Sequence, residues 1–364
     1  MKNRFHFLLT SLLSITFATS PLNAQDNAPV GSENTKPKNI VLLIGDGMGL
    51  SEVSASLFYN KETTNFERFS TIGLIKTSSS SELITDSAAS ATAFSAGIKT
   101  YNGAIGVDKD SIPVETILEQ LVEKGFATGL IATSSIVHAT PASFFAHSKS
   151  RRLYEDIATF LPTAKIDFLA GGGTTFFNNR EDGKDLFSAF KNNGYEVHTE
   201  ELPKTASKGK QVILLAENAM PKMLDGRGDF LPNATALALE ALSKNETGFF
   251  LMIEGSQIDW GGHDNDADYL ISELLDFDKT IGTVLDFCQK NTETLVIVTA
   301  DHETGGFTLS AENGDYNKLE PTFSTGGHSA TMVPVFAEGP GASHFGGIYE
   351  NTAIYEKIKN LLIE

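Results

Sequence analysis

Five short apolar runs constrain the fold of this 364-residue chain more than any other feature. They are rich in β-branched residues or phenylalanine and nearly continuous in hydrophobicity, which is typical of strands buried on both faces of a sheet. The runs are Asn39–Ile44, Ala127–Ala132, Ile166–Ala170, Gly248–Ile253 and Thr294–Thr299. We therefore expect a central sheet whose two faces are both covered.

Helical patterns lie between these runs. Apolar residues recur every 3.6 positions in Pro113–Lys124 and Asp268–Gln289, and Ala234–Ser243 and Thr352–Leu362 are shorter candidates. Strands that alternate with helices predict an α/β fold with a mostly parallel sheet flanked by helices on both faces. We expect Gly171–Gly228 to form excursions from that core. Ligands in such folds bind beyond the carboxyl ends of the strands.

The N-terminus has the pattern of a targeting segment. Lys2 and Arg4 precede a mostly apolar stretch, Phe5–Ala18, that is too short and too broken for a membrane span. The small residue Ala24 then precedes a polar run. The pattern predicts a signal peptide at 1–24, a flexible leader at 25–38 and a single domain at 39–364, in a protein exported to the periplasm or secreted. The alternative is an N-terminal core helix.

Charge and cysteine content exclude several classes of protein. The chain has 46 Asp and Glu against 28 Lys and Arg, for a net charge of −18, which argues against a nucleic-acid-binding surface. One cysteine, Cys288, excludes an intrachain disulfide or a cysteine-built metal site. Cys288 lies in a helical pattern and is expected to be a buried apolar filler. An acidic protein should also repel anionic substrates unless local charge reverses this effect.

Carboxylates, imidazoles and hydroxyls follow four of the five predicted strands, at what should be one edge of the sheet. These side chains are Asp46, His138, Thr140, Glu254, Asp259, His263, Asp301 and His302, with His328 further along. Asp and His are typical zinc ligands, whereas Asp, Glu and Thr oxygens suit magnesium. A lone histidine is more often a hydrogen-bonded core or surface residue, but the whole set predicts a metal cluster. Gly261 and Gly262 suggest that Asp259 and His263 lie in a loop.

Ser87 opens an alanine-rich helical pattern and is a candidate nucleophile. The start of a helix favours negative charge, so it suits an activated oxygen or a bound phosphate. The alternative is an ordinary N-cap formed by Asp86 or Ser87, and both interpretations can hold together. The neighbouring arginines Arg151 and Arg152 allow two interpretations. Both are solvated surface charges, or one of them binds two phosphate oxygens through its guanidinium group.

Several blocks of the sequence resemble the alkaline phosphatase family. The stretch Ile84–Asp108 is similar to that family's nucleophile segment. The other matching blocks follow the family's order between Lys38 and His328, and they are Gly45–Gly49, His138–Ala142, Glu254–Asp259 with His263, and Ala300–Gly306. The resemblance implies a homodimeric enzyme that hydrolyses small-molecule phosphate monoesters at alkaline pH. The net charge predicts no nucleic-acid partner, and the sequence after the targeting segment contains no apolar stretch long enough to predict a membrane partner.

The resemblance also implies a role for each candidate residue. Ser87 would form a phosphoseryl intermediate, Arg151 would bind the phosphoryl oxygens, and Asp86 would orient Arg151. The implied metal ligands are Asp259, His263 and His328 for one zinc ion, Asp46, Asp301 and His302 for a second, and Asp46, Thr140 and Glu254 for magnesium. Carboxylates bound to three divalent cations would make the surroundings of Ser87 positive in an acidic protein.

Two positions depart from the pattern of the family. Enterobacterial members have Asp where His138 stands and Lys where Trp260 stands, and the animal enzymes have His at both. We expect His138 and Trp260 to act around the magnesium and the phosphate rather than as direct ligands, and the identity and affinity of the third metal stay open. The stretch between His302 and His328 is short, so the lobe inserted there must be small.

Two other functions are compatible with this pattern. One is a phosphodiesterase, nucleotide pyrophosphatase or sulfatase on the same fold, and the magnesium trio with Arg151 argues against it because a dianionic monoester needs the extra positive charge. The other is a non-catalytic periplasmic protein that binds metal or phosphate. The presence of both Ser87 and Arg151 argues against that second alternative.

Overall fold

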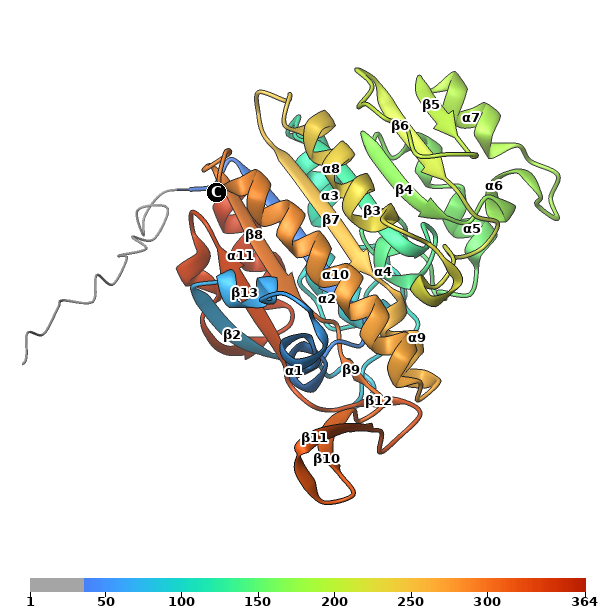
Figure 1. Ribbon diagram of the computed structural model, residues 1–364. Coiled ribbons are helices and arrows are strands. Elements are labelled where there is room, and N and C mark those ends of the chain that lie inside the picture. The colour runs from blue at the N-terminus through green and yellow to red at the C-terminus, as the bar shows by residue number, and fades with distance from the viewer. Residues whose placement is uncertain (1–35) are drawn as a thin grey trace, which may run out of the picture.

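The computed structural model describes residues 36–364, so the predicted signal peptide, 1–24, and most of the predicted leader, 25–38, lie outside the described residues. Among the described residues, ten strands form one sheet in the order β14-β2-β13-β8-β1-β7-β3-β4-β6-β5 (Figure 1). Their bounds are β1 Asn39–Gly45, β2 Thr71–Lys76, β3 Ala127–Ser135, β4 Phe168–Gly172, β5 Tyr195–His198, β6 Lys210–Leu214, β7 Phe249–Gly255, β8 Thr294–Thr299, β13 Val333–Glu338 and β14 Gly347–Glu350.

The five predicted strands are confirmed as the contiguous centre of this sheet. They are β8, β1, β7, β3 and β4, and all the pairings between neighbours among them are parallel. Every residue in these five strands is buried, which explains their continuous hydrophobicity. Only β13 runs antiparallel to its neighbours, β8 and β2. The prediction of a mostly parallel sheet is therefore confirmed.

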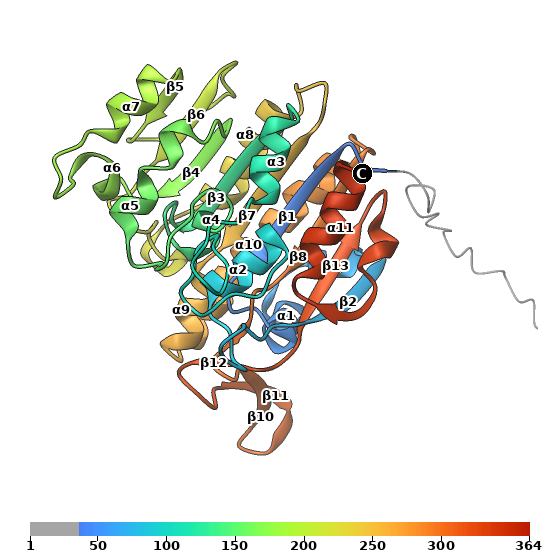
Figure 2. The ribbon, with the colours of Figure 1, turned by 180° about the vertical axis from the view of Figure 1, so that it is seen from behind.

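Helices cover both faces of the sheet. Figure 1 shows α8 and α10 on one face, and Figure 2 shows α2, α3 and α11 on the other. The helix bounds are α1 Leu50–Tyr59, α2 Ser87–Ala96, α3 Ile117–Glu123, α4 Ala139–Ala142, α5 Tyr154–Ala158, α6 Thr175–Asn178, α7 Leu186–Asn192, α8 Phe230–Leu242, α9 Gln257–His263, α10 Ala267–Cys288 and α11 Ala353–Leu362. All four predicted helices are present. The predicted Pro113–Lys124 begins later, at Ile117, because Thr116 and Glu119 form a capping box there.

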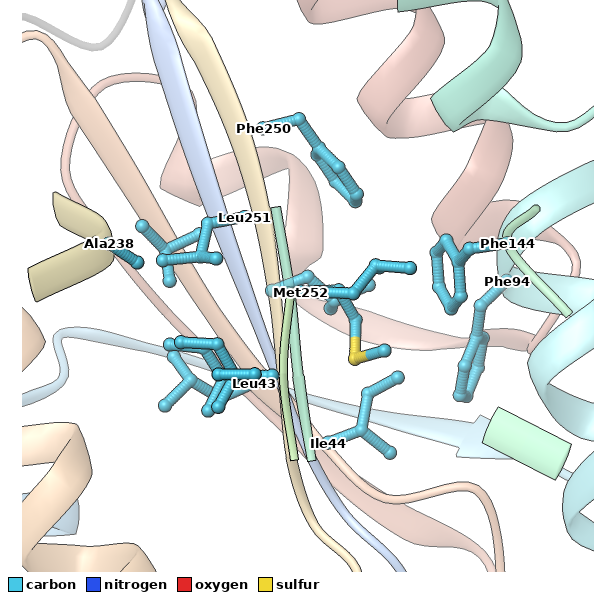
Figure 3. Packing of buried hydrophobic residues seen from close by; sticks show 14 of the residues in the cluster. Leu43, Ile44, Phe94, Phe144, Ala238, Phe250, Leu251 and Met252 are labelled. Carbon is cyan, nitrogen blue, oxygen red and sulfur yellow. The ribbon is translucent and has the colours of Figure 1, made fainter. Parts of the chain in front are cut away.

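The core is built by alternating side chains of the central strands. Figure 3 shows Leu43 and Leu251, from neighbouring strands β1 and β7, on the side of Ala238 in α8. Phe250 and Met252, also from β7, point to the opposite side, toward Phe94 of α2 and Phe144. This alternation buries both faces of the sheet and holds the carboxyl ends of the strands in fixed positions.

The expectation that Gly171–Gly228 leaves the core is wrong for much of that segment. It contributes β6 and β5, which extend the sheet at one edge, together with α6 and α7. Phe177 and Phe190 lie fully buried there, with their ring centroids 5.7 Å apart. Most of the glycine and asparagine residues of the segment lie in or next to the connections between these short elements, and that composition concealed the elements in the sequence.

The stretch between His302 and His328 is small, as predicted. It consists mainly of a hairpin, β10 (Thr308–Glu312) and β11 (Asp315–Thr322), that projects from the body of the molecule (Figure 1).

Cys288 is the last residue of α10 and is partly buried. Burial raises the pKa of its thiol to about 12, which fits a packing role. None of the helices in the described part of the chain has the length and apolar character needed to cross a membrane.

Candidate active site

The predicted site residues meet at the carboxyl ends of β1, β3, β7 and β8. Strands β1 and β7 pair in parallel with Ile44 opposite Glu254, and the amide of Asp46 donates to the carbonyl oxygen of Gly255 at 3.2 Å. The loop after β8 brings Asp301 toward the same place, because the amide of Gly47 donates to Asp301 Oδ1 at 3.1 Å. The prediction that these strands deliver their polar residues to one edge is confirmed.

Asp259 and His263 lie on helix α9, so the expectation of a loop is wrong. The two glycines between them allow close packing rather than a turn. A Cβ atom on Gly261 would come within 2.5 Å of the backbone nitrogen of Leu270, and one on Gly262 within 2.8 Å of a neighbouring carbonyl oxygen. On the helix, Asp259 Oδ1 and His263 Nε2 lie 3.4 Å apart on one face.

One group of possible metal ligands is formed by Asp46, Asp301 and His302. His302 Nε2 lies 3.5 Å from Asp46 Oδ1 and 3.2 Å from Asp301 Oδ2, and all three side chains are fully buried. These are the three residues predicted to hold one zinc ion together.

A second group adjoins the first. Asp259, His302 and His328 offer ligand atoms within 4.8 Å of one another, and His263 Nε2 lies 3.1 Å from His328 Nε2. The predicted zinc ligands Asp259, His263 and His328 are thus close together. His302, predicted for the other group, also contacts this one, and its ring stacks on that of His328 with centroids 3.5 Å apart.

Several buried oxygens at this edge have no hydrogen-bond partner among residues 36–364. They are both carboxylate oxygens of Asp46, Asp301 Oδ2, Glu254 Oε1 and Thr140 Oγ1. An unpaired buried polar atom costs roughly 1–3 kcal/mol, so such a group of atoms needs a ligand. Asp46, Thr140 and Glu254 supply the hard oxygen atoms that magnesium prefers, and the donor sets therefore fit the predicted metals.

The pKa values of the carboxyl groups point the same way. Burial, followed by the charge of Asp301, raises the pKa of Asp46 well above its usual range. Burial also raises the pKa of Glu254 to about 7, although the hydrogen bond from Ser256 acts in the opposite direction. Without a cation these carboxyls would retain protons, and a divalent ion can replace those protons.

Ser87 lies at the first position of α2, where Asp86 is the N-cap. Asp86 Oδ1 accepts a hydrogen bond from the amide of Ala89 at 3.0 Å, so the predicted cap is confirmed. Ser87 is 2% exposed, and its Oγ lies 3.3 Å from His302 Nε2 and 3.5 Å from Arg151 Nη1. The candidate nucleophile therefore lies between a predicted metal ligand and a guanidinium group.

Arg151 and Arg152 differ in their surroundings. Arg151 Nη1 donates to Asp86 Oδ2 at 3.0 Å, and the backbone amide of Arg151 donates to Gly103 O at 2.7 Å. Arg152 is exposed. The interpretation of a solvated surface charge therefore fits Arg152, whereas Arg151 lies beside Asp86 and Ser87, and its binding of phosphate stays a prediction.

His138 is partly buried at the N-cap of α4, the helix that carries Thr140. Its ring stacks on Tyr154 with centroids 6.4 Å apart and meets Trp260 edge-on at 5.8 Å. Burial, together with the charge of Arg151, lowers the pKa of His138 to about 3, so the imidazole is neutral. The two positions that depart from the family pattern are thus in direct contact.

Two functional contacts were missed in the sequence. Thr304 Oγ1 donates to Asp259 Oδ1 at 2.5 Å, and Ser256 Oγ donates to Glu254 Oε2 at 2.6 Å. Each hydroxyl lies two residues after a predicted metal ligand, His302 or Glu254. That spacing was a usable signal, because residues bound to metals are commonly held by further hydrogen bonds.

Comparisons with known proteins agree with this geometry. The family model described as alkaline phosphatase matches residues 37–321. Alkaline phosphatase 3 of Bacillus subtilis is 44% identical over 298 residues, a match that covers 77% of this chain but only 64% of that protein. Alkaline phosphatase 4 of the same organism is 38% identical over 367 residues, which cover 95% and 79%. The structure of alkaline phosphatase from the Antarctic bacterium TAB5 has 54% identity and a TM-score of 0.89, covering 90% of this chain and 98% of that one.

Proposed function

Because the chain belongs to the alkaline phosphatase family, we propose that it hydrolyses phosphate monoesters to an alcohol and inorganic phosphate. One observation carries the proposal. Ser87 Oγ lies within 3.5 Å of both Arg151 Nη1 and His302 Nε2, and His302 Nε2 lies within 3.5 Å of buried carboxylate oxygens of Asp46 and Asp301 that have no hydrogen-bond partner among residues 36–364. A nucleophile, an anion-binding group and ligands for cations thus meet in one place.

Ser87 is proposed to attack phosphorus and form a phosphoserine, which water then hydrolyses. The N-terminus of α2 favours negative charge on the serine oxygen and on the phosphoryl group. Turnover should rise toward alkaline pH, because deprotonated oxygens are the nucleophiles in both steps. Ser87→Ala should remove the phosphoserine and lower turnover by roughly three orders of magnitude or more. Turnover unchanged in this variant would exclude the mechanism.

Three metal ions are proposed. Zinc would be held by Asp259, His263 and His328 and by Asp46, Asp301 and His302, and magnesium by Asp46, Thr140 and Glu254. Bound divalent ions supply positive charge that favours deprotonated nucleophiles and stabilises the leaving oxygen. Three divalent ions carry six positive charges against four carboxylates in these sets. The proposed site is therefore positive in spite of the net charge of −18.

Arg151 is proposed to bind two nonbridging phosphoryl oxygens, since a guanidinium matches that geometry with two parallel hydrogen bonds. Asp86 would hold Arg151 in place through the 3.0 Å contact. His138 and Trp260 would keep the surroundings of the magnesium apolar and uncharged.

Monoesters are favoured over diesters because a dianionic phosphoryl group gains more from a third cation. The test is kcat/KM for an aryl phosphate monoester and for the matching diester, with elemental analysis of the same preparation. A preference for the diester would overturn the proposal, and so would a purified protein that binds zinc but turns over neither ester.

Export and a homodimer are also proposed. The signal-peptide pattern of residues 1–24 supports export, and N-terminal sequencing of the mature protein tests it.

The outer face of α1 exposes Leu50, Leu57 and Phe58 by 54%, 51% and 61%, and an exposed apolar stripe of this kind fits a subunit contact. Sedimentation equilibrium of the purified protein would refute the dimer by giving a monomer mass.

A further inference from the structure

Thr304 contacts every segment that carries a predicted zinc ligand. It pairs with His328 where β9 (Glu303–Thr304) meets β12 (His328–Ser329), and its amide donates at 3.1 Å to the carbonyl oxygen of Gly47, the residue after the ligand Asp46. Its side-chain oxygen lies 2.5 Å from Asp259 Oδ1 and 3.2 Å from His302 Nδ1. One buried side chain therefore joins the two groups of ligands.

The number of protons fixes the direction of these hydrogen bonds. A threonine hydroxyl has one proton, and an ionised carboxylate can only accept, so the Thr304 proton points to Asp259. Toward His302 the hydroxyl oxygen can then only accept a hydrogen bond. Nδ1 of His302 must therefore be protonated and donate to Thr304 Oγ1. The Nε2 atom of His302 is therefore the unprotonated one, and this is the atom that faces Asp301 and Ser87.

Packing prevents the Thr304 side chain from turning to another partner. A Cβ atom on Gly47 would lie 2.8 Å from Thr304 Oγ1, and one on Gly262 would lie 3.0 Å from Thr304 Cγ2. The two glycines thus leave just enough room for the hydroxyl on one side and the methyl group on the other. Thr304 itself is fully buried.

From this geometry we propose that Thr304 is a positioning residue that couples the two zinc groups, an inference that rests on the proposed function. Its hydroxyl holds Asp259 in one group while it fixes the ring and tautomer of His302 in the other. An ion bound by either group stabilises the hydrogen bonds that prepare the other group. Coupling of this kind is reciprocal, so loss of the hydroxyl should loosen both ions.

The test compares Thr304→Val, which keeps the shape of the side chain without the hydroxyl, with Thr304→Ser, which keeps the hydroxyl. Thr280→Val is the matched control, because Thr280 is a buried threonine whose hydroxyl donates to Asp276 O within α10. Zinc-loaded proteins are mixed with a coloured chelator and the release of each ion is timed. In parallel, proton NMR of protein with 15N-labelled histidine follows the Nδ1–H signal of His302, one of eight histidines.

Loss of a hydrogen-bond partner of a metal ligand typically lowers metal affinity about 10–100-fold, so Thr304→Val should release both ions faster by about that factor. The variant should also lose the slowly exchanging Nδ1–H signal of His302. Thr304→Ser and Thr280→Val should behave like the wild type. The proposal would be overturned if Thr304→Val released both ions at the wild-type rate. It would also be overturned if the variant released only one of the two ions faster. If both ions loosen but the wild type does not hydrolyse monoesters, the coupling stands and the proposed function fails.

Discussion

Arg151 and Asp86 are joined by a hydrogen bond of 3.0 Å between the guanidinium Nη1 and the carboxylate Oδ2. The other oxygen of Asp86 accepts the amide of Ala89 and so caps α2. One carboxylate therefore fixes both the proposed phosphate-binding arginine and the helix that starts at Ser87. Asp86 therefore helps to set the distance between the nucleophile and the anion-binding group, together with the hydrogen bond of 2.7 Å from the Arg151 amide to Gly103 O.

Arg151→Lys should keep the positive charge but lose the two-pronged contact with the phosphoryl group. A hydrogen bond to a charged group contributes roughly 1.5–3 kcal/mol, so kcat/KM for an aryl phosphate should fall about 10–150-fold. Arg152→Lys is the matched control, since Arg152 is the exposed neighbour, and its kcat/KM should stay at the wild-type level. Equal losses in both variants would show that Arg151 has no special contact with the substrate.

Substitutions of Asp86 separate its two contacts. Asp86→Ala removes the cap of α2 and should lower the free energy of unfolding by about 0.5–2 kcal/mol, measured by urea denaturation. Asp86→Asn retains a capping oxygen and should lower it far less, while still removing the charge that holds Arg151. A loss of stability of the same size in both variants would indicate that the cap is not the stabilising contact.

Removal of the metals should destabilise the fold as well as abolish turnover. Bound ions would pair the buried oxygens of Asp46, Asp301 and Glu254 that have no hydrogen-bond partner within the described part of the chain. Free zinc at about 100 times its dissociation constant should raise the free energy of unfolding by about 2.7 kcal/mol for each site. The melting temperature after chelation and after zinc is restored measures this, and calcium serves as the control ion. A melting temperature that does not respond to zinc would contradict the proposed zinc groups.

His138→Asp should strengthen magnesium binding. The neutral imidazole would be replaced by a carboxylate at the N-cap of α4, the helix that carries Thr140. An added anionic oxygen at the start of the helix that carries the proposed ligand Thr140 should favour a hard divalent ion there. Magnesium content after gel filtration should rise relative to the wild type, and the exposed His344→Asp should leave it unchanged. No increase in the variant would mean that position 138 does not reach the third site.

The centre of the sheet could be predicted and its edges could not, for a physical reason. Strands such as β1 and β8 are buried on both faces, so nearly all of their residues are apolar or small. The outer strands β2 and β5 mix buried and exposed residues over six and four positions, too few to establish a period. Their place in the sheet depends on contacts with distant segments, which no local pattern records.

The same distinction applies to the site. Asp46, Asp301 and His302 were found because carboxylates, imidazoles or hydroxyls follow four of the five predicted strands, and such a set is hard to explain as ordinary loop residues. The role of the Thr304 hydroxyl could not be predicted in this way. It depends on a contact of 2.5 Å with Asp259, which is 45 positions away in the sequence. The glycines of α9 were misread because close packing against a neighbouring segment, like a turn, favours glycine.

A final prediction concerns pH and lies away from the metals. His147 Nε2 is 2.9 Å from Glu119 Oε1, and its Nδ1 is 2.7 Å from Gly106 O, so both ring nitrogens face acceptors. The hydrogen bond to Glu119 raises the pKa of His147 above its ordinary 6.5. Burial acts to raise the pKa of Glu119, but the hydrogen bonds from His147 and Thr116 outweigh it and hold that pKa below 4.5.

These shifts define a window of stability. The contribution of His147 is complete below pH 6.5 and is lost as the pH rises through its higher folded-state pKa. The contribution of Glu119 is complete above pH 4.5 and is lost as the pH falls through its lower folded-state pKa. The pair therefore stabilises the fold fully between pH 4.5 and 6.5, and less at the alkaline pH proposed for turnover. Because Glu119 is 36% exposed, we expect an effect of only about 0.2–1 kcal/mol.

His147→Gln isolates this effect, since glutamine can donate a hydrogen bond but does not titrate. The free energy of unfolding is measured by urea denaturation at pH 6 and at pH 9. Its decrease from pH 6 to pH 9 should be smaller in the variant than in the wild type by about 0.2–1 kcal/mol. His198→Gln is the control, because His198 lies at the outer edge of the sheet, 3.8 Å from Glu196, and forms a much longer pair. A variant that loses as much stability as the wild type between these two pH values would show that His147 is not charged at pH 6.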